Sequence, residues 1–88
     1  MTERGRPLIV LDVETQRLAQ EVGGWRNRHK LGVSVAVTYN EATGLYHTYL
    51  ERELDALFQE LEGAGAVVGY NLLDFDYAVL APYAPGGF

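Results

Sequence analysis

The sequence predicts an α/β domain built on a mixed sheet, with its elements in the order β-β-β-α-β-α. Three features predict this class: an early apolar run rich in β-branched residues, an alternating segment followed by a turn, and a later segment with apolar residues at helical spacing. The 88 residues allow a single domain, 1–88. Apolar residues make up 48% of the chain and charged residues 22%, which is typical of a folded globular protein.

The first half of the chain predicts three strands. Residues 8–13 form a continuous apolar run, which is typical of a central strand covered on both faces. Residues 15–30 are polar, and we expect a helix in their first half. Residues 40–44 form a turn, so 45–50 are expected to return as the second strand of a hairpin. The first strand of that hairpin is expected over residues 31–39, where larger apolar residues alternate with small or polar ones. The residues expected on one face are Leu31, Val33, Val35, Val37 and Tyr39.

The second half predicts a helix, a strand and a second helix. The first helix is expected over residues 51–62, because its apolar residues recur at i, i+3, i+4 and i+7 as Leu54, Leu57, Phe58 and Leu61. Ala66 to Tyr70 are predicted to form a short buried strand. The last helix is expected from about Asp74 to Leu80, and Pro82 ends it because proline lacks an amide donor.

Three carboxylates fall at the ends of predicted elements. Asp12 and Glu14 end the first strand, and at i and i+2 they point the same way. Asp76 follows the fourth strand. If strands one and four are parallel neighbours, their carboxyl ends meet at the edge where open α/β sheets bind ligands. An unpaired charge at Asp12, inside an apolar strand, would be costly, so we expect a basic partner from residues 26–30.

A cation would relieve the repulsion among three converging carboxylates. Oxygen ligands favour Mg²⁺ or Mn²⁺, and such an ion can activate a bound water and hold a phosphodiester. A structural interpretation stays open, because Asp-x-Glu is common at strand ends and Asp76 suits the start of a helix. The candidate metal ligands and catalytic residues are therefore Asp12, Glu14 and Asp76.

The residues around these carboxylates resemble the DEDD-type 3′–5′ exonucleases, which have a ribonuclease H-like fold. Residues 11–15, Leu-Asp-Val-Glu-Thr, are similar to the first motif of that family. Residues 68–80 are similar to its second motif, which here contains Asn71, Phe75, Asp76 and Leu80. The spacing of the second motif and residues 21–29 also resemble a group of bacterial helicase-associated ribonuclease H-like domains.

This resemblance implies a metal-dependent nuclease that acts on single-stranded nucleic-acid ends. It implies that Asp12, Glu14 and Asp76 bind the metal. It further implies that Asn71 positions the backbone or a nucleotide and that Phe75 packs under the site.

The family completes its site with a third motif, a Tyr or His followed by an Asp on a further helix. Residues 77–88 contain no Asp, Glu or His. We therefore expect a truncated domain, similar to the N-terminal half of such a nuclease, with little or no autonomous activity. The alternative is a non-catalytic nucleic-acid-binding or assembly module of the same fold.

The segment after the first strand supplies further candidates for substrate binding. Trp25 could stack on a base or cover the core. Arg26 and Arg28 could contact phosphates, or they could lie in a solvated loop or neutralise the carboxylates. Both interpretations stay open for each of these residues.

Charge and composition exclude several classes of protein. Twelve acidic and seven basic residues give a net charge of −5, which argues against a basic coat on DNA. The chain has no cysteine, so disulfides and thiolate metal sites are excluded. No apolar run is long enough for a membrane helix, and residues 1–7 lack the pattern of a signal peptide. We therefore expect a cytoplasmic protein that does not enter membranes.

The predicted fourth strand would leave an open edge, which invites pairing with another chain. The aromatic residues Tyr77, Tyr83 and Phe88 are of the kind enriched at interfaces. We expect a homo-oligomer, most simply a two-fold dimer with residues 66–88 at its centre.

Overall fold

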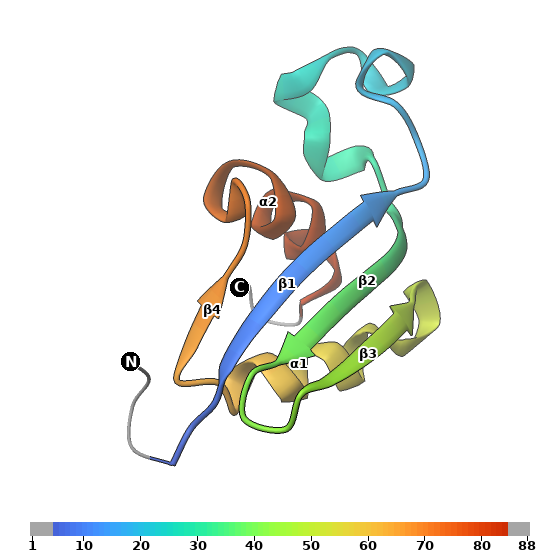
Figure 1. The fold of residues 1–88 in the computed structure, drawn as a ribbon. Helices are drawn as coiled ribbons and strands as arrows, with labels where there is room; N and C mark the ends of the chain where they lie inside the picture. Colours follow the sequence, from blue (N-terminus) through green and yellow to red (C-terminus); the bar gives the residue numbers. More distant parts are fainter. Residues whose placement is uncertain (1–4, 85–88) are drawn as a thin grey trace.

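The computed structural model describes residues 5–84, which form one four-stranded mixed sheet with short helices (Figure 1). The strand order is β3-β2-β1-β4. The predicted α/β class and mixed sheet are confirmed. Phe88 and residues 1–4 lie outside the described residues. Within residues 5–84, no helix is both long enough and apolar enough to cross a membrane.

The three N-terminal strands form an antiparallel meander. It consists of β1 (Leu8–Thr15), β2 (Val33–Asn40) and β3 (Leu45–Leu50). The short strand β4 (Ala66–Val68) pairs with β1 in parallel. The predicted hairpin is confirmed, and the parallel pairing of strands one and four meets the condition for their carboxyl ends to lie together. At the edge of the sheet, β4 is shorter and more exposed than expected, with Val68 45% exposed.

The core lies on one side of the sheet. On β1, the side chains of Ile9, Leu11 and Val13 are buried, whereas Val10 is 38% exposed. The helices α1 (Leu54–Glu62) and α2 (Tyr77–Leu80) both add buried side chains to the same core. In Figure 1, α1 passes behind β1 and β2, and none of the helices within residues 5–84 crosses the near face of the sheet. The expectation that β1 is covered on both faces is therefore wrong for the part of the chain that the structure describes.

A register shift decides which face of β2 meets the core. Glu14 pairs with Val35 and Thr15 pairs with Val33, so the ladder skips Ser34. Beyond this bulge, Ala36 and Thr38 are the buried residues of β2. The alternating pattern correctly predicted a strand. The expectation that all five residues, Leu31, Val33, Val35, Val37 and Tyr39, share one face was wrong, because the bulge turns over the side chains that follow it.

The predicted helix over residues 51–62 begins as a 3₁₀ turn, Glu51–Glu53, and continues as α1. Leu54 and Leu57 are buried, and Phe58 and Leu61 pack against the core. The apolar face predicted from their spacing is thus confirmed.

The connection from β1 to β2 contains two 3₁₀ segments in place of the expected helix, Ala19–Val22 and Trp25–Lys30. Gly23 and Gly24 separate them with φ values of 91° and 112°, which side chains other than glycine rarely allow. The connection closes where the Gln16 N–H donates to the Gly32 carbonyl at 3.0 Å.

After β4 the chain passes close to β1. A Cβ atom at Gly69 would lie 2.6 Å from the Leu11 carbonyl oxygen, so this passage requires glycine. A π-helical turn, Leu72–Asp76, follows and leads directly into α2. The predicted last helix is therefore present but irregular. A further 3₁₀ turn, Ala81–Tyr83, includes Pro82 in its first turn.

Candidate functional site

An open hollow of about 300 Å³ lies at the carboxyl end of β1. The parallel pairing of β1 and β4 returns the chain to this end, so both carboxylate segments reach it. We call this feature the acidic hollow; its lining consists of Asp12, Val13, Glu14, Thr15, Tyr70, Asn71, Phe75 and Asp76. The structure thus brings together the three carboxylates that the sequence singled out, along with Asn71 and Phe75.

The three carboxylates differ sharply in burial. Asp12 and Glu14 are exposed, because they alternate with the core residues of β1. Asp76 is only 2% exposed. The expectation that Asp12 is a buried charge is therefore wrong, and the buried carboxyl group belongs to Asp76.

Burial, together with the negative charges of Asp12 and Glu14, raises the pKa of Asp76 to about 6. Hydrogen bonds from backbone N–H groups, those of Asp76 itself and of Val13, act in the opposite direction. The main electrostatic feature of this site is therefore the buried carboxyl group of Asp76 close to the carboxylates of Asp12 and Glu14. Such a perturbed group inside a hollow is a candidate for a functional role.

The acidic hollow offers the oxygen donors that Mg²⁺ and Mn²⁺ prefer. Within residues 5–84, however, no three His, Cys, Asp or Glu side chains are grouped closely enough to hold a metal ion. The donor chemistry fits a hard cation, whereas the arrangement does not form a complete three-point site.

Backbone geometry sets the position of the turn that carries Asp76. Asn71 adopts the left-handed conformation, with φ of 60° and ψ of 38°, which asparagine tolerates better than most residues. Its carbonyl accepts a hydrogen bond from the Phe75 N–H at 3.0 Å. Asn71 therefore has a structural role in the turn, in addition to its exposed position in the lining of the acidic hollow.

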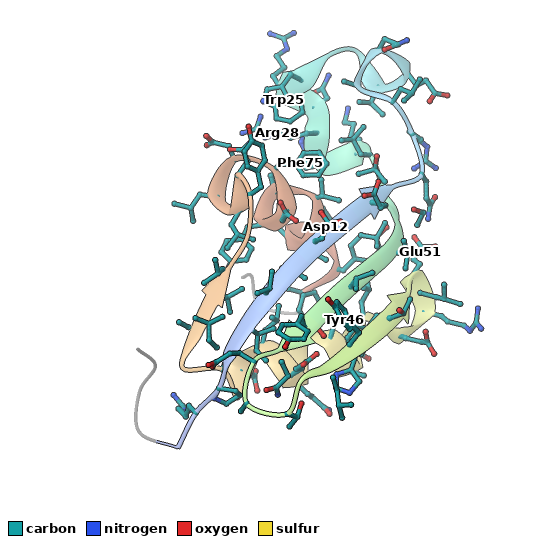
Figure 2. All side chains as sticks on the ribbon, in the orientation of Figure 1. Asp12, Trp25, Arg28, Tyr46, Glu51 and Phe75 are labelled. Carbon is teal, nitrogen blue, oxygen red and sulfur yellow. The ribbon has the colours of Figure 1, made fainter. Side chains whose placement is uncertain are left out.

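An aromatic contact joins the β1–β2 connection to this turn. The rings of Trp25 and Phe75 are stacked, with centroids 5.6 Å apart and planes 10° apart. The Arg28 guanidinium lies 5.4 Å from the centre of the Trp25 ring and donates hydrogen bonds to the carbonyls of Asp74 and Trp25. Figure 2 shows Trp25, Arg28 and Phe75 grouped beyond Asp12, at the carboxyl end of β1.

The positions of Trp25 and its neighbours bear on both interpretations of this segment. Trp25 is 49% exposed, so its ring both packs on Phe75 and faces solvent. Arg28 bonds to backbone carbonyls of the protein, and Arg26 is exposed without lining the acidic hollow. Base stacking by Trp25 and phosphate contacts by the two arginines stay predictions.

Sequence reasoning missed a polar cluster on the core side of the sheet. Glu60 accepts hydrogen bonds from the buried Thr38 hydroxyl and the Tyr49 hydroxyl, both at 2.7 Å, and lies 3.4 Å from His47 Nδ1. Burial alone would raise the pKa of Glu60, but these partners hold it below its ordinary value. Burial and the bond to Glu60 raise the pKa of Tyr49 to about 12. The alternation of residues 31–39 gives no sign of the cluster, because the bulge in β2 turns Thr38 to the core side.

Tyr70 is a second residue that the sequence did not single out. It is 95% exposed, lines the acidic hollow and lies two residues after the end of β4. The sequence signal for this residue was its aromatic side chain at the position directly before Asn71, inside the second candidate motif.

Comparison with known proteins leaves the family open. A scan of protein-family models found no match for this chain, and a search of the curated proteins found none either. The resemblance to the DEDD-type exonucleases therefore depends on the two motifs alone and stays a prediction.

Proposed function

We propose that this chain is an incomplete 3′–5′ exonuclease-like domain of ribonuclease H-like fold, in which the acidic hollow is a partial site for Mg²⁺ or Mn²⁺. The observation that carries the proposal is the meeting of both motifs at one hollow. There, burial raises the pKa of Asp76, and the negative charges of Asp12 and Glu14 from β1 contribute to that rise. A cation bound among these carboxylates would relieve that repulsion.

The expected activity of the 88-residue chain is little or none. A bound cation would supply an activated water and a clamp on the phosphodiester. The described residues do not form a three-point site, so we assign no cleavage step to them. Residues 77–88 also offer no Asp, Glu or His as a general base, a group that typically contributes about 10²–10⁴-fold to rate.

A second candidate function is a non-catalytic nucleic-acid-binding module of the same fold. It is favoured by the half-exposed Trp25 ring beside the acidic hollow and by the exposed Arg26 on the same 3₁₀ segment. Stacking of one base on an aromatic side chain is worth about 1–3 kcal/mol. A single stacking residue would give weak binding with little preference for sequence.

One experiment with labelled single-stranded DNA and RNA separates the two functions. The oligonucleotides are incubated with the chain and Mn²⁺, and both their length and their fluorescence anisotropy are measured. The proposed function predicts weak binding that increases with Mn²⁺ and decreases in Asp12→Ala, with no substantial shortening. The exposed Asp55→Ala on α1 serves as the control and should behave like the wild type.

Three outcomes would change the assignment. Vigorous Mn²⁺-dependent shortening that disappears in Asp76→Asn would show a complete nuclease. Binding that ignores Mn²⁺ but disappears in Trp25→Ala would favour the non-catalytic module. No binding with either nucleic acid would contradict both functions.

A further inference from the structure

Two tyrosines lie ring against ring on the β2–β3 hairpin. Tyr39 and Tyr46 are direct partners in the register of the two strands, so their side chains lie on the same side of the sheet. Their ring centroids are 4.8 Å apart, and the ring planes are tilted by 51°. This distance is within the range for attractive aromatic pairs, in which the ring edges are in contact. We call these two residues the tyrosine pair.

The turn of the hairpin holds the tyrosine pair in place. The Asn40 carbonyl accepts a hydrogen bond from the Gly44 N–H at 2.8 Å. The Asn40 side chain accepts two more, from the N–H groups of Ala42 and Thr43 at 2.9 and 3.3 Å. The turn is therefore closed by its own hydrogen bonds, and the two rings are fixed beside each other before any reaction begins.

Both phenol groups can be reached from solution. Tyr46 is 72% exposed, and Tyr39 is half-buried. Within residues 5–84, no hydrogen bond involves either of these two hydroxyl groups. The neighbouring Tyr49 differs, because its hydroxyl donates to Glu60 at 2.7 Å. The tyrosine pair thus combines ring contact with hydroxyl groups that are open to a reagent.

The composition of the chain favours oxidation at tyrosine. The chain has no cysteine, so it contains no thiol that could reduce a tyrosyl radical. Its single tryptophan, Trp25, belongs to the β1–β2 connection. In Figure 2, Trp25 lies beyond the carboxyl end of β1, whereas Tyr46 lies on the β2–β3 hairpin.

We propose that the tyrosine pair is a modification site, at which a one-electron oxidant joins the two rings as an intramolecular dityrosine. A haem peroxidase with hydrogen peroxide is an oxidant of this class. Each phenol gives one electron to the oxidant and its hydroxyl proton to water, which leaves two phenoxyl radicals. A carbon–carbon bond then forms between one Cε atom of each ring. The hydrogens on these two carbons leave as protons and the two oxygens are protonated again, while one hydrogen peroxide is reduced to two water molecules.

The cross-link would fasten the edge of the sheet. β3 is an outer strand in the order β3-β2-β1-β4, and a covalent bond beside the turn ties it to β2. Such a bond also restricts the unfolded chain, which stabilises the folded state. The reaction uses no residue that lines the acidic hollow, and it needs neither a bound cation nor a nucleic acid. It is therefore independent of the proposed function, and either can fail without the other.

Oxidation of the full chain in dilute solution, with a haem peroxidase, hydrogen peroxide and a metal chelator, tests the proposal. We expect dityrosine emission from a monomer whose mass is lower by two hydrogen atoms. Tyr46→Phe keeps the ring but removes the reacting hydroxyl, so the yield of dityrosine in the monomer should fall by at least about tenfold. Tyr70→Phe is the matched control, because Tyr70 is 95% exposed but lies outside the hairpin, and it should leave that yield unchanged.

Peptide mapping of the oxidised wild type needs no variant. Cleavage after glutamate separates Tyr39, in residues 22–41, from Tyr46, in residues 42–51. These two peptides should stay joined after oxidation and should separate without it. The proposal would be overturned by an absence of dityrosine, by dityrosine found only between two copies of the chain, or by a yield that falls in Tyr70→Phe but not in Tyr46→Phe.

Urea unfolding measures what the bond does for the fold. The oxidised wild type should unfold at a higher urea concentration than the untreated protein, whereas oxidised Tyr46→Phe should match its own untreated form. Equal midpoints for the oxidised and untreated wild type would contradict the fastening of β3 to β2.

Discussion

The ring of Trp25 lies nearly parallel to the ring of Phe75, and this stack joins the β1–β2 connection to the turn that ends at Asp76. Arg28 strengthens the junction, because it lies over Trp25 and also bonds to the carbonyl of Asp74. The junction lies beside the acidic hollow and connects two segments that are far apart in sequence. It therefore helps to position the buried carboxyl group of Asp76.

Replacing Phe75 with Leu should weaken this junction while keeping an apolar side chain. We expect a loss of about 0.5–1.5 kcal/mol in the free energy of unfolding, which is the range for an aromatic pair beyond its buried area. Trp25 is the single tryptophan of the chain, so its fluorescence emission should also shift to longer wavelength. Urea unfolding and emission spectra measure both effects. The control is Leu73→Ala, because Leu73 is 80% exposed on the same turn. An unchanged Trp25 emission in Phe75→Leu would contradict the stacked arrangement.

The raised pKa of Asp76 predicts that this residue destabilises the fold near neutral pH. Its pKa rises from 3.8 to about 6 in the folded protein, so the protonated form is favoured by folding. The fold keeps this advantage below pH 3.8 and loses it as the pH rises through about 6. The loss amounts to about 2–3 kcal/mol.

Asp76→Asn should therefore be more stable than the wild type at neutral pH, with the difference shrinking as the pH falls toward 4. Urea unfolding at a series of pH values measures the two stability curves. Asp74→Asn changes an exposed acid in the same turn and should follow the wild-type curve. Parallel curves for wild type and Asp76→Asn would contradict the raised pKa.

Glu60 should be the most sensitive polar residue on the core side of the sheet. Glu60→Ala leaves the buried Thr38 hydroxyl without its acceptor and also removes the partner of Tyr49. We expect a loss of about 1–3 kcal/mol in unfolding free energy, since an unsatisfied buried group costs its full desolvation. Glu62→Ala, an exposed change on the same helix, is the control. Equal stabilities of the two variants in urea would show that the cluster contributes nothing.

Gly69 and Gly63 form a matched pair for testing the close passage beside β1. Gly69→Ala would place a Cβ 2.6 Å from the Leu11 carbonyl oxygen and 2.7 Å from Leu72 Cδ2, so the backbone must move. We expect destabilisation of about 1–3 kcal/mol, as for overpacking in a core. At Gly63 the nearest atoms are 3.6 and 3.9 Å away, so Gly63→Ala should be neutral or slightly stabilising. Thermal unfolding compares the two. A harmless Gly69→Ala would mean that β4 does not approach β1 this closely.

Much of the fold follows from short-range patterns. The hairpin and the apolar face of α1 were predictable, because alternation around a turn and helical spacing determine them. The parallel pairing of β1 and β4 was only a condition for the convergence of the carboxylates, and the structure meets it. The core face of β2 was not predictable, because the bulge that skips Ser34 leaves no mark in the alternation. The one-sided cover of β1 was missed for a related reason. An apolar outer face has the same composition whether or not a helix lies over it.

The candidate site was predictable in its members but not in their burial. Asp12, Glu14 and Asp76 were expected to converge, and they line one hollow. The sequence suggested that Asp12 is the buried charge, since its neighbours are apolar. In the structure, strand alternation exposes Asp12, whereas the π-helical turn buries Asp76. Hydrogen-bonded sets such as Glu60 with Thr38 and Tyr49 depend on side chains from three elements, and sequence spacing does not reveal them.

The most direct test of the account is calorimetric titration of the chain with Mn²⁺ near neutral pH. The partial site predicts weak, saturable binding that is strongly reduced in Asp12→Ala and unchanged in Asp55→Ala. Because Mn²⁺ would displace the proton held by Asp76, the binding heat near pH 6 should also depend on the ionisation enthalpy of the buffer. Identical titrations of the wild type and Asp12→Ala would contradict the claim that the acidic hollow is a cation site.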